Sequence, residues 1–444
     1  MNKYILEGSF QQTSLSRKDT ADKAYISIPL FVNGKLRYGL AHLSERANEL
    51  GIYPTEMGYD IITLAALVYL ADTRISRGRN SQDSWTREIE LVVPVANPYL
   101  WNKMVSVVQR MLRFLTGDLW AVRFIKRDVQ LDSRGERKNK QYDIISLFSG
   151  GMDSLIGSID YLEMKKNILL VSHAGDSLTK KAQNDLLGNL KKDYPNQNVD
   201  QVALWMQFPH NYLCAGDETS TRSRSFLFIS LAVFLITGTT NLRELFIPEN
   251  GVIALNVPLD PLRLGAHSTR TTHPFYLKLW NDLLNGLETG ESVRNIFWNK
   301  TKGEMADECL NKDELYKLIS SSISCSSPQK ARWKGYAPQH CGYCVPCIIR
   351  RAAMFKAFGK DPTQYLVSNL ADVLSDEEKE QSVQLKSFIY AIGNLRATPG
   401  IEKHSILRPG PLPVSANQRL ELASVYKRGL LEVGKFLDAN MKGK

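Results

Sequence analysis

Short apolar runs with strand character alternate with longer runs of helical spacing in residues 1–131. The strand candidates contain many β-branched and aromatic side chains, and an Asn-Gly pair between the first two indicates a hairpin turn. The expected strands are residues 24–32, 35–40, 87–95 and 119–124. The expected helices are residues 59–71 and 101–116. Because no catalytic constellation stands out, we expect this part to form an α+β accessory domain.

A regular exchange of apolar strands and helices follows in residues 142–358, after a polar, charged linker at residues 132–141. The expected strands are residues 143–148, 167–172, 200–206 and 244–248. The expected helices are residues 155–162, 179–192 and 225–237. This rhythm predicts an α/β domain with a parallel sheet covered on both faces, which binds ligands at the carboxyl ends of its strands. Residues 359–444 are expected to form a C-terminal helical region.

The turn after the first strand of this α/β domain reads Ser-Gly-Gly-Met-Asp-Ser, residues 149–154. Gly150 and Gly151 allow the backbone to approach an anion closely. The N–H groups at the start of the following helix favour negative charge, and Ser149 and Ser154 add hydroxyl donors. Asp153 is a candidate ligand for Mg²⁺. An ordinary Gly-rich turn with a Ser or Asp cap is the alternative, but the complete string favours a phosphate site.

Closely spaced cysteines predict a metal site near the end of the same domain. Three of them are separated by two-residue spacers, and thiolates at this spacing converge on one tetrahedral ion. Four thiolates leave no open coordination position, which predicts structural Zn²⁺, with an iron–sulfur cluster as the alternative. The expected ligands are Cys325, Cys341, Cys344 and Cys347. The alternatives to Cys325 as the fourth ligand are Cys309 and His340.

Polar side chains between these two motifs are further candidates for ligand binding. Arg222 and Arg224 precede a long apolar helix near the expected phosphate position, although a surface arginine pair fits the same pattern. His173 ends the second strand of the domain, where it either contacts the ligand or is a satisfied polar side chain. Lys302 opens a helix and either reaches a phosphate or faces solvent. Residues 269–274 form either a base-recognition loop or a structural loop.

Composition fits a globular protein and narrows its partners. The 444 residues are 43% hydrophobic and 23% charged, which excludes a disordered chain. The net charge of +10 suits an anionic partner such as a nucleotide or a nucleic acid, without choosing between them. The longest apolar runs, residues 61–71 and 226–236, are far shorter than a membrane span. With no apolar segment after the first residues, we expect a cytoplasmic protein with no membrane association.

The Ser-Gly-Gly-x-Asp-Ser string after a strand resembles the signature of the PP-loop ATP pyrophosphatases. Together with the spacing C-x15-C-x2-C-x2-C, it resembles the QueC family of 7-cyano-7-deazaguanine synthases over residues 142–358. The resemblance implies a HUP-like parallel sheet and a structural zinc loop at residues 325–347. It also implies that ATP adenylates the carboxylate of 7-carboxy-7-deazaguanine and that ammonia then forms the amide and finally the nitrile.

The resemblance also assigns roles to individual residues. Arg224 falls in a segment similar to the arginine segment of the family, and Lys302 resembles the start of its Asp-Lys-x-Glu helix. The implied catalytic residues are Asp153, Arg224 and Lys302. The implied nucleotide-binding residues are Phe148, Ser149, Gly150, Gly151, Met152, Asp153, Ser154, His173, Arg222 and Arg224. The implied cofactors are ATP, Mg²⁺ and structural Zn²⁺.

Other parts of the chain depart from an ordinary queuosine enzyme. Residues 1–131 and 359–444 have no counterpart there, and residues 172–176 differ from the family pattern. The architecture is more similar to the QueC-like proteins of bacterial anti-phage islands, above all those of Qat-type defence systems. The acceptor of the activated carboxylate is then ammonia or an amine of a partner protein encoded nearby. Two alternatives are a PP-loop enzyme that modifies a tRNA base and a non-catalytic nucleotide-sensing scaffold subunit.

Overall fold

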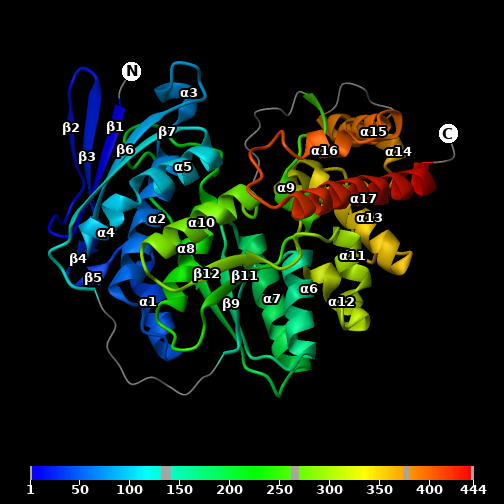
Figure 1. Ribbon diagram of the computed structural model, residues 1–444, viewed down its shortest axis with the longest axis horizontal. Helices are drawn as coiled ribbons and strands as arrows, with labels where there is room; N and C mark the ends of the chain where they lie inside the picture. The colour runs from blue at the N-terminus through cyan, green and yellow to red at the C-terminus, as the bar shows by residue number, and fades with distance from the viewer. Residues whose placement is uncertain (1–2, 132–141, 262–269, 375–379, 442–444) are drawn as a thin grey trace.

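The order of the layers in space follows the order of the chain (Figure 1). The structure, a computed structural model, describes residues 3–131, 142–261, 270–374 and 380–441. The expected linker at residues 132–141 and Thr269 of the polar loop therefore lie outside the described residues. In Figure 1 the N-terminal sheet lies at the left, the second sheet with its helices in the middle, and the C-terminal helices at the right.

A five-stranded sheet of parallel strands forms the middle layer, which confirms the expected α/β class. Its strand order is β10-β9-β8-β11-β12. The bounds are β8 (Ile144–Leu147), β9 (Ile168–His173), β10 (Val199–Leu204), β11 (Glu244–Ile247) and β12 (Ser292–Asn295). The chain winds outwards from β8 through β9 to β10 and then crosses to β11. The winding therefore reverses beside β8, and sheets of this kind bind ligands at such a switch point.

Helices cover both faces of this sheet, and β9 shows why. All six residues of β9 are buried, with Leu169 and Val171 in one hydrophobic core and Ile168 and Leu170 in another. Side chains alternate across a strand, so a strand buried on both faces is apolar throughout. The first core includes α8 (Arg224–Ile236) and α10 (Pro274–Gly286). The second includes α6 (Met152–Glu163) and α7 (Ser177–Asp193).

The N-terminal part contains a mixed sheet with the order β2-β3-β1-β6-β7, in which only β2 is antiparallel to its neighbour. The main strands are β1 (Lys3–Ser9), β2 (Ser16–Asp19), β3 (Lys23–Pro29), β6 (Glu88–Val95) and β7 (Leu119–Lys126). The predicted hairpin forms as two short strands, β4 (Phe31–Val32) and β5 (Lys35–Leu36). The helices are α1 (Leu40–Glu49), α2 (Glu56–Arg74), α3 (Arg77–Asn80), α4 (Pro98–Lys103) and α5 (Val105–Thr116). Sequence patterns missed β1, β2 and α1.

The N-terminal part shares its hydrophobic core with the parallel sheet. Helix α2 packs against α8, and the long apolar sequences of both helices are buried. The approach is close, since a Cβ atom at Gly58 of α2 would clash with Oγ1 of Thr237, the residue that ends α8. One cluster of buried side chains runs from the N-terminal sheet into β8 and β9. The N-terminal part is therefore packed directly on the layer that carries the Ser-Gly-Gly motif.

A buried cluster of charges connects the N-terminal part to the start of α8. Asp72 and Asp118 are each bound by both Arg77 and Arg87, at distances of 2.6–3.0 Å. All four side chains are at most 4% exposed. Asp72 also accepts a hydrogen bond of 2.7 Å from the backbone N–H of Ser223, the residue before α8. Because every charge has partners, the cluster fixes the backbone that carries the neighbouring arginines.

The C-terminal helices form a third layer around their own core. They share this core with three of the clustered cysteines. The elements after the parallel sheet are α11 (Lys302–Asp307), α12 (Lys312–Leu318), α13 (Val345–Phe358), α14 (Ala371–Leu374), α15 (Glu380–Ala397), α16 (Ile401–Ser405) and α17 (Ala416–Met441). A further short helix, α9 (Gly251–Leu255), follows β11 and packs against α17. The third layer is therefore helical, as expected.

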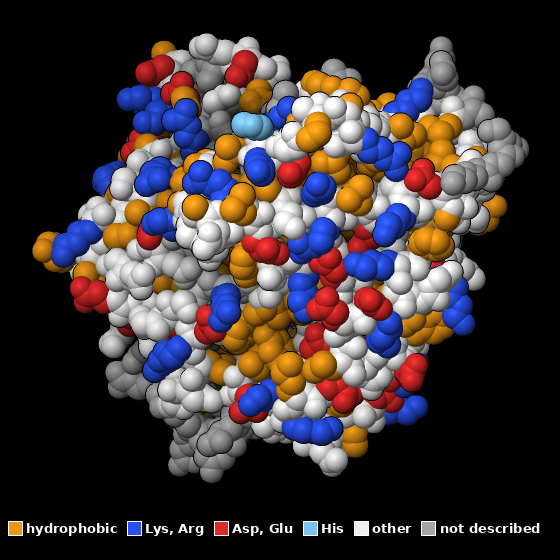
Figure 2. All heavy atoms as spheres, turned by 45° about the vertical axis from the view of Figure 1, so that its right-hand side comes forward, with side chains coloured by type: hydrophobic (Ala, Val, Ile, Leu, Met, Phe, Trp, Pro, Cys, Tyr) orange, Lys and Arg blue, Asp and Glu red, His pale blue; other side chains and the backbone are white. Residues whose placement is uncertain are grey.

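The face of the molecule in Figure 2 carries charges of both signs. Lys and Arg side chains are interspersed with Asp and Glu side chains there, despite the net charge of +10. A continuous basic stripe, which marks many nucleic-acid-binding proteins, is not seen on this face. None of the helices in the described part of the chain has both the length and the apolar content needed to cross a membrane.

Candidate functional site

The Ser-Gly-Gly-Met-Asp-Ser loop connects β8 to α6 at the switch point of the parallel sheet. Gly150 has a φ angle of +80°, a conformation that residues with a Cβ atom rarely adopt. Gly151 caps the start of α6 in an extended conformation. The two glycines thus turn the chain sharply from the strand into the helix, and the helix N-terminus faces the end of the sheet.

Two backbone N–H groups of this loop are bound by hydroxyl oxygens. Gly151 N–H donates to Ser149 Oγ and Met152 N–H donates to Ser324 Oγ, each at 3.3 Å. These distances are at the long end for N–H···O bonds, so anion oxygens can replace the hydroxyls at little cost. The hydroxyls of Ser149 and Ser154 lie 3.3 Å apart beside the same N–H groups. The arrangement suits a phosphate group at a helix N-terminus.

A cavity of about 490 Å³ opens beside the loop. This volume is within the range of roughly 300–1,000 Å³ found for small-molecule sites. The polar lining residues include Ser149, Ser154, Asp176, Thr179, Arg222, Arg224, Glu249, Thr271 and Ser324. The structure thus brings two serines of the predicted site, Ser149 and Ser154, together with Arg222 and Arg224.

Other predicted binding residues lie behind the cavity wall. The side chains of Phe148 and Met152 are fully buried in the core that contains α6. His173 is 1% exposed, and its Nδ1 and carbonyl oxygen accept hydrogen bonds from Arg224 at 3.3 and 3.1 Å. Burial and the charge of Arg224 lower the pKa of His173 to about 3, so its ring is neutral near pH 7. His173 therefore orients Arg224.

Asp153 and Lys302 form a buried ion pair, and neither lines the cavity. Lys302 Nζ lies 2.6 Å from Asp153 Oδ1. Asp153 Oδ2 accepts hydrogen bonds from the backbone and side-chain N–H groups of Asn250, at 3.1 and 2.7 Å. Both carboxylate oxygens therefore have partners. This geometry does not fit the expected Mg²⁺ site at Asp153, and it makes Lys302 the counter-charge of Asp153.

Arg222 reaches from the segment before α8 to the N-terminal part. Its guanidinium donates to the carbonyl oxygen of Thr116 at 2.8 Å and lies 4.0 Å from the ring centre of Trp85. Burial, together with the charge of nearby Arg77, lowers the pKa of Arg222 to about 10. The group is still cationic near pH 7, and incomplete neutralisation by protein carboxylates makes it available to an anionic ligand.

Glu249 is a cavity residue that the sequence patterns did not single out. It lies two residues after the end of β11, and its Oε2 accepts a hydrogen bond from the hydroxyl of Thr272. Burial, with a smaller contribution from the charge of Asp153, raises the pKa of Glu249 to about 7, although the hydrogen bond from Thr272 and the charge of Lys302 lower it. Its place at the carboxyl end of a strand beside the switch point is the signal that would have identified it.

The four expected cysteines, Cys325, Cys341, Cys344 and Cys347, form one cluster. Their sulfur atoms all lie within 4.8 Å of one another, and the Cys325–Cys344 and Cys341–Cys347 pairs are each 3.9 Å apart. A tetrahedral Zn²⁺ with Zn–S bonds of about 2.3 Å requires sulfur atoms about 3.8 Å apart. The backbone N–H groups of Cys341 and Cys344 point at cluster sulfurs, at 3.4 and 3.3 Å, which stabilises thiolates. The cluster could therefore hold a zinc ion.

The structure separates the alternative ligands from this cluster. Cys309 is buried in the core around α6, where its thiol donates to the carbonyl oxygen of Asn311. His340 lies next to the cluster in sequence, but its Nε2 accepts a hydrogen bond of 3.1 Å from the backbone of Ser324. Among the described residues, Cys325 is thus the side chain that completes the group of four.

Arg350 links the cysteine cluster to the glycine loop, residues 149–154. It lies on α13, three residues after Cys347, and is fully buried. Its guanidinium donates to Ser322 Oγ at 2.8 Å and to Ser324 Oγ at 3.3 Å. Ser324 in turn accepts the hydrogen bond from Met152 N–H. The segment before Cys325 is therefore held between α13 and the glycine loop.

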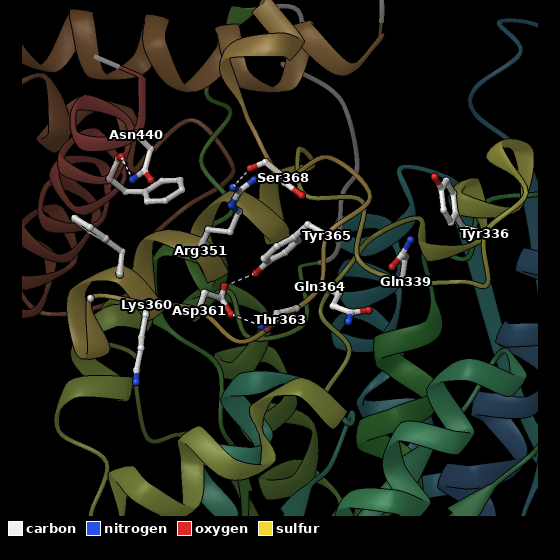
Figure 3. A pocket seen from close by; sticks show the side chains of 13 residues that line it. Tyr336, Gln339, Arg351, Lys360, Asp361, Thr363, Gln364, Tyr365, Ser368 and Asn440 are labelled. Carbon is white, nitrogen blue, oxygen red and sulfur yellow. Dashed lines mark hydrogen bonds between the residues drawn. The ribbon is translucent and has the colours of Figure 1, made fainter. Parts of the chain in front are cut away.

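A second cavity of about 620 Å³ lies beside α13 and α17 (Figure 3). The charged side chains that line it, Arg351, Lys360 and Asp361, contact other groups of the protein. In Figure 3, Arg351 points towards Ser368, whose carbonyl oxygen it contacts, and the hydroxyl of Tyr365 donates to Asp361 at 2.6 Å. None of the residues predicted from the sequence lines this cavity. The smaller cavity at the glycine loop is therefore the better candidate site.

Comparisons with known proteins add no assignment. No protein-family model matches the chain, and a search of curated proteins finds no matching relative.

Proposed function

We propose that the chain is an ATP-dependent adenylating enzyme that activates the carboxylate of a 7-deazaguanine-type substrate and passes the acyl group to an amine. The observation that carries the proposal is the Ser-Gly-Gly-Met-Asp-Ser loop at the switch point, where Ser149, Ser154, Arg222 and Arg224 line one cavity. The cysteine cluster supports it, because Cys325 lines the same cavity and the cysteine spacing resembles that of the QueC family.

The chemistry proceeds in two displacements. An oxygen of the substrate carboxylate attacks the α-phosphorus of ATP, and the bond from that phosphorus to the bridging oxygen of pyrophosphate breaks. The amine nitrogen then attacks the acyl carbon of the adenylate, AMP leaves with the electrons of the C–O bond, and the nitrogen loses a proton to solvent or a base. Arg222 and Arg224 would neutralise phosphate charge, while the loop serines and N–H groups position it.

We further propose that the acceptor is an amine of a partner protein, as part of a Qat-type anti-phage system. The support is architectural. The N-terminal part holds Arg222 through Trp85 and Thr116, and the C-terminal helices pack around the cysteine cluster. Both additions to a QueC-like core therefore act on the candidate site, and they add surface on which a protein partner can dock. No step is assigned to Mg²⁺, since Asp153 does not fit as its ligand.

The test is release of pyrophosphate by the purified protein with ATP and 7-carboxy-7-deazaguanine. We expect release only when both compounds are present, and a loss of about 100-fold or more with Arg224→Gln, since one electrostatic contact to a transferring phosphate is worth about 3 kcal/mol. Arg243→Gln, at an exposed arginine outside the cavity, is the matched control. Absence of release, with the neighbouring gene products also present, contradicts the proposal. A deazapurine acyl mass on one of those proteins identifies the acceptor.

A further inference from the structure

We propose that Glu249 recognises the edge of a guanine-type ring in the cavity, where a ring N–H and an exocyclic NH₂ group stand side by side. The inference rests on the proposed function and names the residue that selects its substrate class. It starts from the two carboxylates that line the cavity, Asp176 and Glu249.

The carboxylate of Asp176 already accepts hydrogen bonds from the first turn of its own helix. It caps α7, and its two oxygens accept hydrogen bonds from the backbone N–H and the hydroxyl of Thr179, at 2.9 and 2.7 Å. Within the described residues, Glu249 accepts a single side-chain hydrogen bond, from Thr272 to Oε2. Glu249 lines the cavity, no hydrogen bond from a described residue reaches its Oε1, and Oε2 retains a second lone pair.

The position of Glu249 is fixed relative to the phosphate loop. The next residue, Asn250, is fully buried and binds Asp153 through both its backbone and its side chain. Asp153 lies in the first turn of α6, two residues after Gly151. Thr272 holds the carboxylate from the other side. A ligand whose charged end lies on the loop would thus meet Glu249 in one defined orientation.

The chemistry of the carboxylate selects among rings. Two carboxylate oxygens accept two parallel hydrogen bonds, which matches the adjacent N–H and NH₂ donors of a guanine-type ring. Adenine presents an NH₂ donor next to a ring nitrogen acceptor, so one carboxylate oxygen would face a lone pair. Glu249 therefore favours the deazaguanine substrate and disfavours a second adenine nucleotide in the same place. The two donated hydrogen bonds also stabilise the charged form of a carboxylate whose pKa burial has raised.

The test exchanges the hydrogen-bonding pattern of this residue. In Glu249→Gln, the amide offers one acceptor and one donor, which matches a xanthine-type edge. We measure kcat/KM for 7-carboxy-7-deazaguanine and for the corresponding 7-deazaxanthine acid. The wild-type protein should prefer the guanine-type acid by about 100-fold, and Glu249→Gln should lose or reverse this preference while its KM for ATP stays within about threefold. The control is Glu45→Gln, an exposed carboxylate on α1, which should keep the wild-type ratio.

The outcomes separate this inference from the proposed function. No activity of the wild-type protein with either acid contradicts the proposed function itself. An active wild-type protein and a folded Glu249→Gln variant with the same ratio overturn the role of Glu249. If kcat/KM of the variant falls equally for both acids and the variant needs more Mg²⁺, Glu249 acts on the metal rather than on the ring, and the inference is overturned. If the variant does not fold, the affinity of the wild-type protein is measured for each acid. Tighter binding of the guanine-type acid supports the inference, and equal affinities overturn it.

Discussion

Lys302 Nζ lies 2.6 Å from Asp153 Oδ1, and the two side chains are only 7% and 12% exposed. The pair joins the first turn of α6, which follows the glycine loop, to the first residue of α11. The start of α11 is itself held by Glu432 of α17, which accepts hydrogen bonds from Thr301 Oγ1 at 2.7 Å and Gly303 N–H at 2.9 Å. A continuous chain of contacts thus runs from the C-terminal helix to the glycine loop.

Replacing Lys302 with Met should strongly destabilise the protein, because the Asp153 carboxylate is then buried without its counter-charge. We expect a loss of about 3–5 kcal/mol in the free energy of unfolding, measured by urea denaturation. The double variant Lys302→Met/Asp153→Asn should recover part of this loss, since an Asn side chain keeps an acceptor for Asn250.

The matched control is Lys300→Met, which removes a half-exposed pair with Glu308 and should cost no more than about 1 kcal/mol. Strictly additive effects of Lys302→Met and Asp153→Asn would show that the pair is not an interacting unit.

Metal content distinguishes the cysteine cluster from the other buried cysteine. The purified protein should contain about one zinc ion per chain, and Cys325→Ser should lose most of it, because a structural site needs all four ligands. Cys309→Ser should keep the full content, since this thiol lies in a different core. Mass spectrometry of the metals measures both variants. Equal zinc in Cys325→Ser and the wild-type protein, or iron in place of zinc, contradicts the assignment.

Arg350 of α13 should help to position the glycine loop through Ser324. In Arg350→Met, Ser324 loses one of the groups that hold it beside Met152 N–H, so we expect the affinity for ATP to fall by about tenfold. Zinc content should stay unchanged, because Arg350 contacts no cysteine sulfur among the contacts described. Arg350→Lys should show a smaller loss, and the exposed Arg396→Met should show none. Unaltered ATP affinity in a folded Arg350→Met protein refutes this positioning role.

Local patterns predicted the parts of the fold that depend on neighbouring residues. The strand-to-helix turn at Gly150 and Gly151 needs residues without a Cβ atom, so it is visible in the sequence. The four cysteines are close in sequence. The tight turn between Cys341 and Cys344 contains Gly342, whose φ of +89° again favours glycine. The parallel sheet followed from the alternation of strands and helices. These features were therefore predictable before the structure was known.

Features that depend on distant residues were not predictable in this way. Strand β1 lies in the centre of the N-terminal sheet because it pairs in parallel with β3 and β6, and such pairing leaves little local signal. Lys302 has the same helix-start context whether it reaches a phosphate or Asp153, and only the fold decides. Ser324 and Glu249 likewise lie at the site through packing against the glycine loop and Thr272.

The raised pKa of Glu249 predicts a specific dependence of stability on pH. Burial raises the pKa from an ordinary value of 4.5 to about 7. Between these pH values the folded protein keeps a proton that the unfolded chain has released, so the free energy of unfolding falls as pH rises and levels off above pH 7. One pKa unit corresponds to about 1.4 kcal/mol, which limits the contribution of Glu249 to about 3 kcal/mol. Glu249→Gln should remove this contribution.

The difference between the wild-type and variant curves isolates Glu249 from other buried groups. Asp60, whose pKa burial also raises to about 7, gives a slope of the same sign. His173, whose pKa is lowered to about 3, gives the opposite slope, because its unfolded form binds the proton. Both contributions, and the charges of Asp153 and Lys302 that face Glu249, are common to the two proteins. Because glutamine resembles protonated glutamate, urea denaturation between pH 4.5 and about 8 should give curves that agree at low pH and separate as pH rises, with the wild-type protein the less stable. Parallel curves would mean that the pKa of Glu249 is the same in the folded and the unfolded protein.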